Sequence, residues 1–160
     1  AYCGDIRFFC VPFTEIQEKI KDNCPEELFT IIMRRIMMKI AQKIAVRENL
    51  SALILGESVG QVASQTMGAI VCTDAVAEMP VFRPVIGMDK SEIVEIARKI
   101  DTFDISIEPY EDCCTVFTPK HPKTAPVLSD VEKAEALFDF EPLIDKAVEE
   151  TEVKLFKAEF

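Results

Sequence analysis

The chain has 160 residues, of which 49% are apolar and 29% are charged, the size and balance of one compact folded domain rather than of a disordered segment. Its 18 Lys and Arg stand against 28 Asp and Glu, and the net charge of −10 argues against a broad basic face that grips phosphate backbones. No run approaches the ~18 consecutive apolar residues of a membrane helix, and the first residues lack the features of a secretion signal. The six cysteines form no Cys-x-x-Cys pair, and this usage is typical of a reduced, cytoplasmic protein.

The N-terminal third predicts one strand followed by two helices. Residues 6–13 form a continuous apolar run (IRFFCVPF) with aromatic and β-branched residues, which is typical of a buried strand. Thr14 is a candidate N-cap for a short helix that reaches Lys21. Pro25 opens a long helix that extends to about Glu48, in which apolar side chains recur every four residues. This wide apolar stripe is expected to pack on a sheet.

The middle of the chain alternates strands with helices. Residues 52–55 (ALIL) form a short apolar run that ends at Gly56 and predicts an interior strand. Residues 81–86 (VFRPVI) predict the next strand, and Asp89 followed by Glu92 predicts a capping box at the start of another helix. Strands that alternate with helices predict an α/β fold, in which helices cover both faces of a parallel sheet.

The C-terminal part is expected to be less regular. Residues 101–127 are rich in proline and cysteine and predict a loop. Two short acidic helices are expected near residues 129–137 and 142–149. We therefore treat residues 1–150 as one domain and residues 151–160 as a C-terminal tail.

Two adjacent arginines lie within the long predicted helix. The residues three and four positions from Arg34 are apolar, so its guanidinium must either reach solvent or meet an anion, because an unpaired buried charge is costly. A solvent-reaching or salt-bridged arginine is the ordinary explanation, and a bound phosphate is the functional one. Arg35 has Lys39 beside it and is expected to face water.

A glycine-containing segment follows the second predicted strand. In residues 56–66 (GESVGQVASQT) a strand ends at Gly56 and a helix begins shortly afterwards. The backbone N–H groups of such a helix start can point at a phosphate, an adenine edge or a ribose. The segment lacks the spacing of a Walker loop or of a dinucleotide-binding fingerprint, so an ordinary strand-to-helix turn is an equal alternative.

Cysteine and lysine supply the remaining candidates for chemistry. Cys113 and Cys114 stand in a predicted loop, where a thiol whose pKa is lowered could act as a nucleophile or sulfur carrier; buried or incidental thiols are the alternative. Lys90 could reach a phosphate from the first turn of its helix, or remain solvated. Cys10 and Cys72 lie among apolar residues and are interpreted as core side chains. Because no Cys-x-x-Cys pair occurs, no metal site is predicted.

Four segments, taken together, resemble one family. In chain order they read MRRIMMKIA, LGESVGQVASQT, FRPVIGMDKSEIVEIARKI and PYEDCCTVFTP. They resemble the C-terminal ATP-pyrophosphatase domain of the tRNA 4-thiouridine synthetase family, the thiamine-biosynthesis sulfurtransferases also called ThiI. The resemblance covers nearly all of residues 1–150. It implies an adenine-nucleotide α-hydrolase-like fold, which is Rossmann-like.

The resemblance also implies a reaction and the residues that serve it. In the family, ATP adenylates O4 of a uridine near position 8 of tRNA, and a persulfide sulfur then displaces AMP. ATP and Mg²⁺ are the implied cofactors. The positions that match the family's ATP site are Arg34, Gly56 and Gln65, and those that match its lysine and its reactive cysteine are Lys90 and Cys113. Cys114 stands where relatives often have glycine, so either thiol could carry the sulfur.

Further expectations follow from the same resemblance. The implied partners are tRNA, bound through N-terminal domains, a cysteine desulfurase as sulfur donor and a thiocarboxylate sulfur-carrier protein. The family's S-G-G-x-D-S phosphate loop is absent from the sequence, so we expect a fold that lacks the first strands and the PP-loop. The exposed sheet edge that this would leave could pair with a second copy in a homodimer. Another PP-loop ATP-pyrophosphatase and a catalytically idle α/β interaction module are the alternatives.

Overall fold

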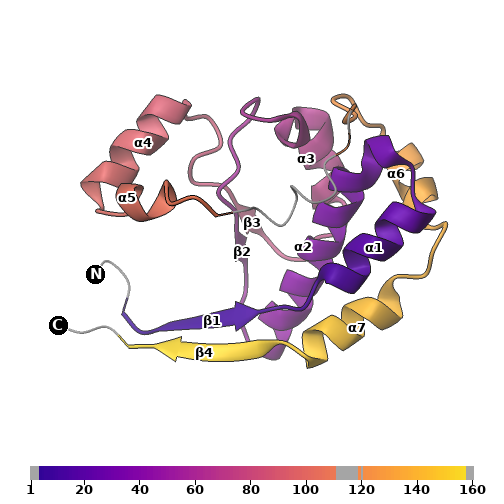
Figure 1. Ribbon diagram of the computed structural model, residues 1–160, viewed down its shortest axis with the longest axis horizontal. Helices are drawn as coiled ribbons and strands as arrows, with labels where there is room; N and C mark the ends of the chain where they lie inside the picture. Colours follow the sequence, from indigo (N-terminus) through magenta and orange to yellow (C-terminus); the bar gives the residue numbers. More distant parts are fainter. Residues whose placement is uncertain (1–3, 111–118, 120, 158–160) are drawn as a thin grey trace.

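A layer of helices dominates the computed structural model, which describes residues 4–110, 119 and 121–157 (Figure 1). Its central helix is α2 (Phe29–Arg47), which contacts every other helix of the layer. The other helices of this layer are α1 (Thr14–Asn23), α3 (Met67–Asp74), α6 (Leu128–Glu135) and α7 (Glu141–Glu149). A short 3₁₀ turn, η1 (Glu26–Leu28), leads into α2. The long helix expected after Pro25 is thus confirmed, with a 3₁₀ first turn.

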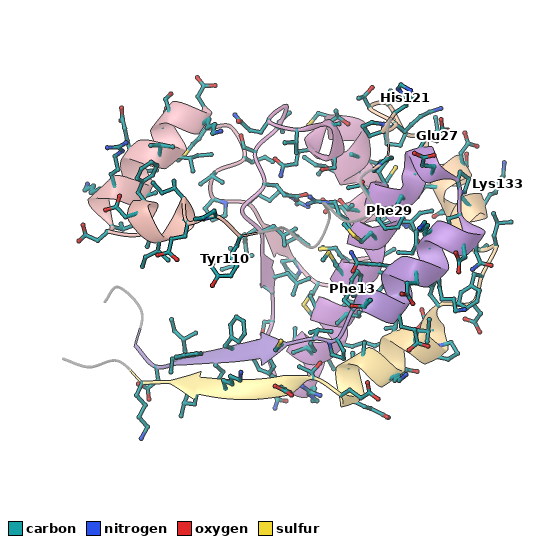
Figure 2. All side chains as sticks on the ribbon, viewed as in Figure 1. Phe13, Glu27, Phe29, Tyr110, His121 and Lys133 are labelled. Atoms are coloured by element: carbon teal, nitrogen blue, oxygen red, sulfur yellow. The ribbon has the colours of Figure 1, made fainter. Side chains whose placement is uncertain are left out.

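Helix α2 is buried on more than one side. Ten of its 19 residues are buried, and it packs mainly against other helices while it also contacts β2. The apolar stripe therefore meets α1, α3 and α7 rather than chiefly a sheet. Phe13 and Phe29, labelled in Figure 2, lie in this layer. The side chains at the centre of the core, each at most 2% exposed, are Ile16, Ile20, Ile32, Ile36 and Ile144. Burying an isoleucine contributes about 1.5–3 kcal/mol.

A parallel pair of strands holds the segment expected to carry the site. Strand β2 (Leu53–Ile54) pairs with β3 (Val81–Phe82), in the register Leu53 to Val81 and Ile54 to Phe82. Figure 1 shows this pair between the helical layer and the helices α4 (Lys90–Lys99) and α5 (Phe103–Ser106). The predicted α/β fold with a parallel sheet is confirmed. Ile54 and Phe82 nevertheless remain 71% and 57% exposed.

An antiparallel ribbon stands apart from the parallel pair. Strand β1 (Ile6–Cys10) pairs with β4 (Glu152–Phe156), and the aromatic rings of Phe8 and Phe156 meet edge to face. The strand was predicted correctly, but its predicted burial is wrong, since Phe8 is 51% exposed. Cys10 is exposed as well, not a core side chain. An apolar run indicates a strand but does not ensure that another layer covers it.

The C-terminal segment contains more structure than a tail. Helices α6 and α7 match the two acidic helices that the sequence predicts. Residues of the expected tail form β4, which returns to the N-terminal strand. Within the predicted loop 101–127, the chain forms the short helix α5. None of the described helices combines the length and the apolar character that crossing a lipid bilayer requires.

Candidate functional site

An ion pair between α2 and the segment after β2 forms the centre of the site. Nη2 of Arg34 donates to Oε1 of Glu57, the residue that follows Gly56. The Glu57 side chain is only 4% exposed, whereas that of Arg34 keeps 23%. The anion that Arg34 was expected to meet is therefore a carboxylate of the chain itself. Its Nε is nevertheless buried without a hydrogen-bond partner.

A second arginine reaches the same carboxylate from the end of β3. Nε of Arg83 donates to Oε2 of Glu57 at 2.6 Å, and its two terminal nitrogens donate to the two carboxylate oxygens of Asp74. Burial acts to lower the pKa of Arg83, but the hydrogen bonds to Asp74 and Glu57 outweigh it and raise this pKa above its ordinary value. We call these four alternating charges, Arg34, Glu57, Arg83 and Asp74, the Arg34 cluster.

The loop after β2 folds back on itself through Gln65. The backbone N–H of Ser58 donates to Oε1 of Gln65 at 3.2 Å, and the N–H of Gly60 donates to the Gln65 carbonyl at 3.0 Å. Gly60 has a φ of 81°, a left-handed conformation that glycine adopts without steric cost. At Gly56, a Cβ would meet no heavy atom within 4 Å, so the backbone there is open to a ligand.

The same loop is tied to the start of α4. Oγ of Ser58 donates to the Met88 carbonyl at 2.7 Å, and the N–H of Val59 donates to the Ile86 carbonyl at 3.0 Å. Lys90, the first residue of α4, is exposed two positions beyond Met88. Lys90 therefore lies close in the chain to the segment 86–88, whose carbonyl groups accept hydrogen bonds from the loop.

The starts of α3 and α4, which lie near this loop, are both capped, and the cap of α4 is the one that the sequence predicts. The backbone N–H of Asp89 donates to Oε2 of Glu92 at 2.7 Å, within the capping box of α4. At α3, Oγ1 of Thr66 accepts from the N–H of Ala69 at 3.2 Å. The predicted site residues Arg34, Gly56 and Gln65 thus meet at the loop that joins β2 to α3. Lys90 begins α4, and the loop is hydrogen-bonded to the segment just before that helix.

The comparisons with known proteins agree on one family. The sequence model described as "Thiamine biosynthesis protein (ThiI)" matches residues 1–140. The chain belongs to the ThiI family. It is 59% identical over 152 residues to the "Probable tRNA sulfurtransferase" of Acetivibrio thermocellus, covering 95% of this chain and 39% of that protein. The corresponding protein of Clostridium acetobutylicum is 54% identical over 152 residues, with 95% and 40% covered.

A solved structure shares the fold. It is described as "Crystal structure of a 4-thiouridine synthetase - RNA complex with bound ATP", and it matches with a TM-score of 0.90 at 38% identity. The match covers 96% of this chain and 40% of that one. The resemblance drawn from the motifs is confirmed, and so is the adenine-nucleotide α-hydrolase type of fold. The chain spans about 40% of the length of the curated ThiI relatives given above.

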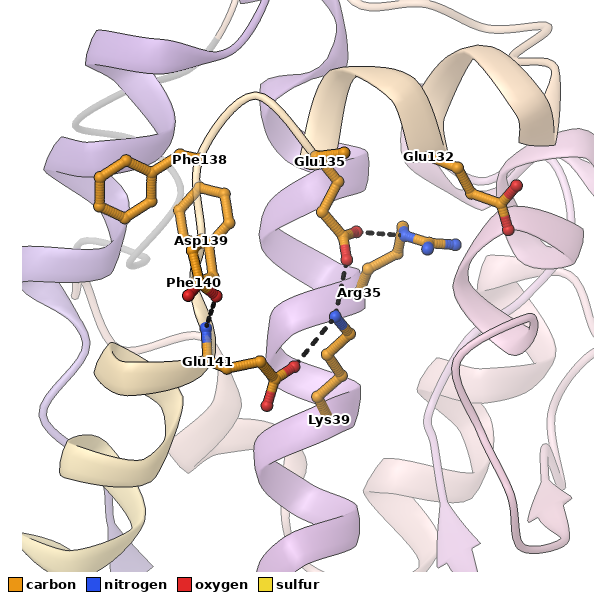
Figure 3. A pocket seen from close by; sticks show the side chains of 9 residues that line it. Arg35, Lys39, Glu132, Glu135, Phe138, Asp139, Phe140 and Glu141 are labelled. Atoms are coloured by element: carbon orange, nitrogen blue, oxygen red, sulfur yellow. Dashed lines mark hydrogen bonds and ion pairs between the residues drawn. The ribbon is translucent and has the colours of Figure 1, made fainter.

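The prediction that Arg35 of this ThiI chain faces water is wrong. It is 4% exposed rather than solvated, and its Nε donates to Oε2 of Glu135 at 2.5 Å while its Nη1 donates to the Cys72 carbonyl at 2.6 Å. Nζ of Lys39 donates to the other oxygen of Glu135 at 2.7 Å (Figure 3). We call Arg35, Lys39 and Glu135 the Arg35 cluster. It lines a cavity of about 400 Å³ that includes none of the predicted site residues.

The two predicted sulfur carriers, Cys113 and Cys114, lie outside the described residues. Tyr110, before them in the chain, is 88% exposed (Figure 2). Among the cysteines that the structure describes, Cys72 is buried, as predicted. Burial raises the pKa of the Cys72 thiol, and it raises the pKa of the Cys24 thiol to about 11, with the nearby Glu135 charge adding to the effect. Neither has the lowered pKa of a reactive thiol.

Sequence reasoning missed three members of the Arg34 cluster. Glu57 was noted only as part of a loop motif, and Arg83 and Asp74 were not singled out. A local signal existed for Arg83, because a charged residue inside the apolar run of residues 81–86 must find a partner when it is buried. No local signal could name that partner, since Glu57 lies 26 residues away.

Proposed function

We propose that this chain supplies part of the nucleotide site and the sulfur-transfer machinery of an ATP-dependent tRNA sulfurtransferase. The observation that carries the proposal is the convergence of Arg34, Gly56 and Gln65 on one loop beyond β2. In parallel α/β sheets, ligands bind beyond the carboxyl ends of the strands. Membership of the ThiI family and the likeness to a 4-thiouridine synthetase with bound ATP support the same reading.

The residues present fit an adenine nucleotide. The guanidinium of Arg34 retains a buried Nε without an acceptor, and an arginine can offer charge-assisted hydrogen bonds to a phosphate. The backbone at Gly56 leaves room for close approach of a ligand. Among residues 4–110, 119 and 121–157 no group of three or more His, Cys, Asp or Glu side chains is placed to hold a metal. We propose that Mg²⁺ would enter with ATP, because this ion is usually bound through substrate phosphates and one or two carboxylates.

The proposed chemistry has three steps. O4 of a uridine near position 8 of tRNA attacks the α-phosphorus of ATP and pyrophosphate leaves, and we assign Lys90, two residues beyond the Met88 carbonyl that Ser58 binds, to assist this step. The terminal sulfur of a persulfide on Cys113 or Cys114 then attacks the activated carbon, AMP leaves, and a disulfide joins the cysteine to C4 of the base. A second thiol attacks the cysteine sulfur of this disulfide and breaks the S–S bond, which releases 4-thiouridine and leaves a disulfide between the two thiols. Adenylation is what makes the uridine oxygen a leaving group. The same persulfide could serve thiazole synthesis for thiamine.

The proposed partners follow from this chemistry. A cysteine desulfurase would supply the persulfide sulfur, and a thiocarboxylate sulfur-carrier protein would receive it in thiamine synthesis. We propose that tRNA binding does not depend chiefly on this chain, since its net charge of −10 disfavours contact with phosphates. We propose a cytoplasmic location. The exposed apolar ribbon of β1 and β4 is compatible with a homodimer.

Calorimetric titration with ATP and Mg²⁺ tests the nucleotide site. We expect saturable binding to the wild-type chain and affinity reduced about tenfold or more in Arg34→Gln, because a charge-assisted hydrogen bond is lost. Lys43→Met is the matched control, since it removes a cation from the same helix away from the loop. Absence of binding to the wild-type chain would leave the interaction-module alternative.

Whether the isolated chain hydrolyses ATP is a separate question from whether it binds ATP. Because the sequence lacks the S-G-G-x-D-S loop, we expect the isolated chain to bind ATP without hydrolysing it. A pyrophosphate-release assay on the purified chain measures this directly. Release above the buffer background, abolished by Arg34→Gln, would contradict the expectation.

A further inference from the structure

The buried carboxylate of Glu57 holds two arginines at once. One oxygen accepts from Arg34 and the other accepts from Arg83 at 2.6 Å. We propose that Glu57 and Arg83 are positioning residues that hold the guanidinium of Arg34 in place for a nucleotide phosphate. This inference rests on the proposed function, in which Arg34 meets ATP.

A gain in stability does not by itself explain why the charged side chains of Glu57 and Arg83 are buried. Removing two charges from water costs several kcal/mol per ion, and a buried ion pair often contributes less than a well-packed apolar pair would. Here the side chains of Glu57 and Arg83 are 4% and 9% exposed. The cluster joins α2, the loop after β2, the end of α3 and the end of β3, so it fixes these elements relative to one another at the loop that carries Gly56 and Gln65.

Arg34 differs from an arginine that serves structure only. The Nε of neighbouring Arg35 donates to Glu135 at 2.5 Å, whereas the Nε of Arg34 is buried with no acceptor. A guanidinium that the protein leaves incompletely hydrogen-bonded retains the capacity to bind an anion. The side chain of Arg34 also keeps 23% exposure, so a ligand can reach it from the surface while Glu57 holds its Nη2.

Arg83 completes the charge pairing of Glu57. The two terminal nitrogens of Arg83 are held by Asp74, which leaves its Nε directed at Glu57. Because Arg83 pairs with one oxygen of Glu57 and Arg34 with the other, both oxygens of this buried carboxylate stay paired while Glu57 holds Arg34 in place. The penalty of an unpaired buried carboxylate is thereby avoided. Asp74, on the outer side of the cluster at 41% exposure, anchors Arg83 in turn.

Glu57→Gln tests the proposal, with Glu135→Gln as the matched control. Both changes remove the charge of a buried carboxylate that pairs with an α2 arginine. We expect Glu57→Gln to weaken ATP binding about tenfold, equivalent to about 1.4 kcal/mol, and Glu135→Gln to leave it within about twofold. Thermal unfolding of each variant shows that it remains folded. Equal ATP affinity in Glu57→Gln and the wild-type chain would overturn the proposal.

A double-mutant cycle separates positioning from general support. If Arg83 acts through Glu57, then Glu57→Gln combined with Arg83→Gln weakens ATP binding no more than Glu57→Gln alone, and additive losses would contradict the proposal. Asp74→Asn is a milder variant, because this residue is partly exposed. If Glu57→Gln does not fold, Asp74→Asn decides, with an expected loss of about two- to threefold.

Nitrogen-15 spectroscopy of the Arg34 side chain gives a readout that is independent of ATP. The Nε–H signal, assigned by its loss in Arg34→Gln, should exchange slowly with water in the wild-type chain and at least about tenfold faster in Glu57→Gln. Unchanged exchange would overturn the positioning role. A wild-type chain that binds no ATP would overturn the proposed function instead, and the exchange rates would still decide whether Glu57 positions Arg34.

Discussion

Arg34 and Arg35 are neighbours on one helix and have opposite surroundings. Arg35 is buried, and its Nε and Nη1 donate to Glu135 and to the Cys72 carbonyl. Arg34 keeps 23% exposure and shares its carboxylate with a second arginine, and its Nε has no acceptor. The side chains of consecutive helical residues point about 100° apart, so two adjacent charged side chains can lie in different surroundings. The contrast suits a structural role for the Arg35 cluster in the helical layer and the binding role that we propose for Arg34 at the loop.

The largest expected effect comes from opening the Arg35 cluster. Glu135→Ala leaves Arg35 as a buried charge without its carboxylate, which should lower the free energy of unfolding by about 3–5 kcal/mol. Urea denaturation followed by circular dichroism measures the change. A loss below about 1 kcal/mol would remove the distinction between the two clusters, because it would make this ion pair equivalent to an exposed one.

The Cys24 thiol reports on the charge of Glu135. With its pKa raised to about 11, its thiolate forms only at high pH, so alkylation at pH 8 should be about 100-fold slower than for an ordinary thiol of pKa near 9. The rate should rise about tenfold per pH unit up to about pH 11. Iodoacetamide labelling read by mass spectrometry of the Cys24 peptide checks this. Glu135→Gln should speed the reaction, whereas Glu57→Gln should not.

Arg34→Gln should disturb folding less than Glu135→Ala. Glu57 keeps its hydrogen bond from Arg83, so the buried carboxylate is not left unpaired, and the expected loss is about 1–2 kcal/mol. The same urea experiment measures it. A loss as large as that of Glu135→Ala would mean that both arginines are structural and would weaken the functional assignment of Arg34.

The smallest effect is expected further along the same helix. Nζ of Lys43 bonds to Asp145 at 2.6 Å and to Glu141 at 3.1 Å, and these hydrogen bonds raise the pKa of Lys43 although burial opposes them. All three side chains are well exposed. Lys43→Met should therefore change the free energy of unfolding by about 0–1 kcal/mol. Any difference from the wild-type chain should disappear in ~1 M salt, where screening is strong.

Local patterns in the sequence predict much of the fold correctly. The α4 capping box, the long apolar helix and the alternation of strands and helices depend on residues close together in the chain, so spacing alone reveals them. The pairing of β1 with β4 joins residues about as far apart as the chain allows. No local pattern encodes that pairing or shows that both strands remain exposed.

The sequence by itself determined the family and the identity of Arg34, Gly56, Gln65, Lys90 and Cys113 as candidates, because motif order and spacing are properties of the chain. Only the tertiary structure decided which charges meet. Glu57 lies 23 residues from Arg34, and Glu135 lies 100 residues from Arg35. An ion pair depends on distance in space, and two adjacent arginines with similar local sequences therefore acquire different partners only when the chain folds.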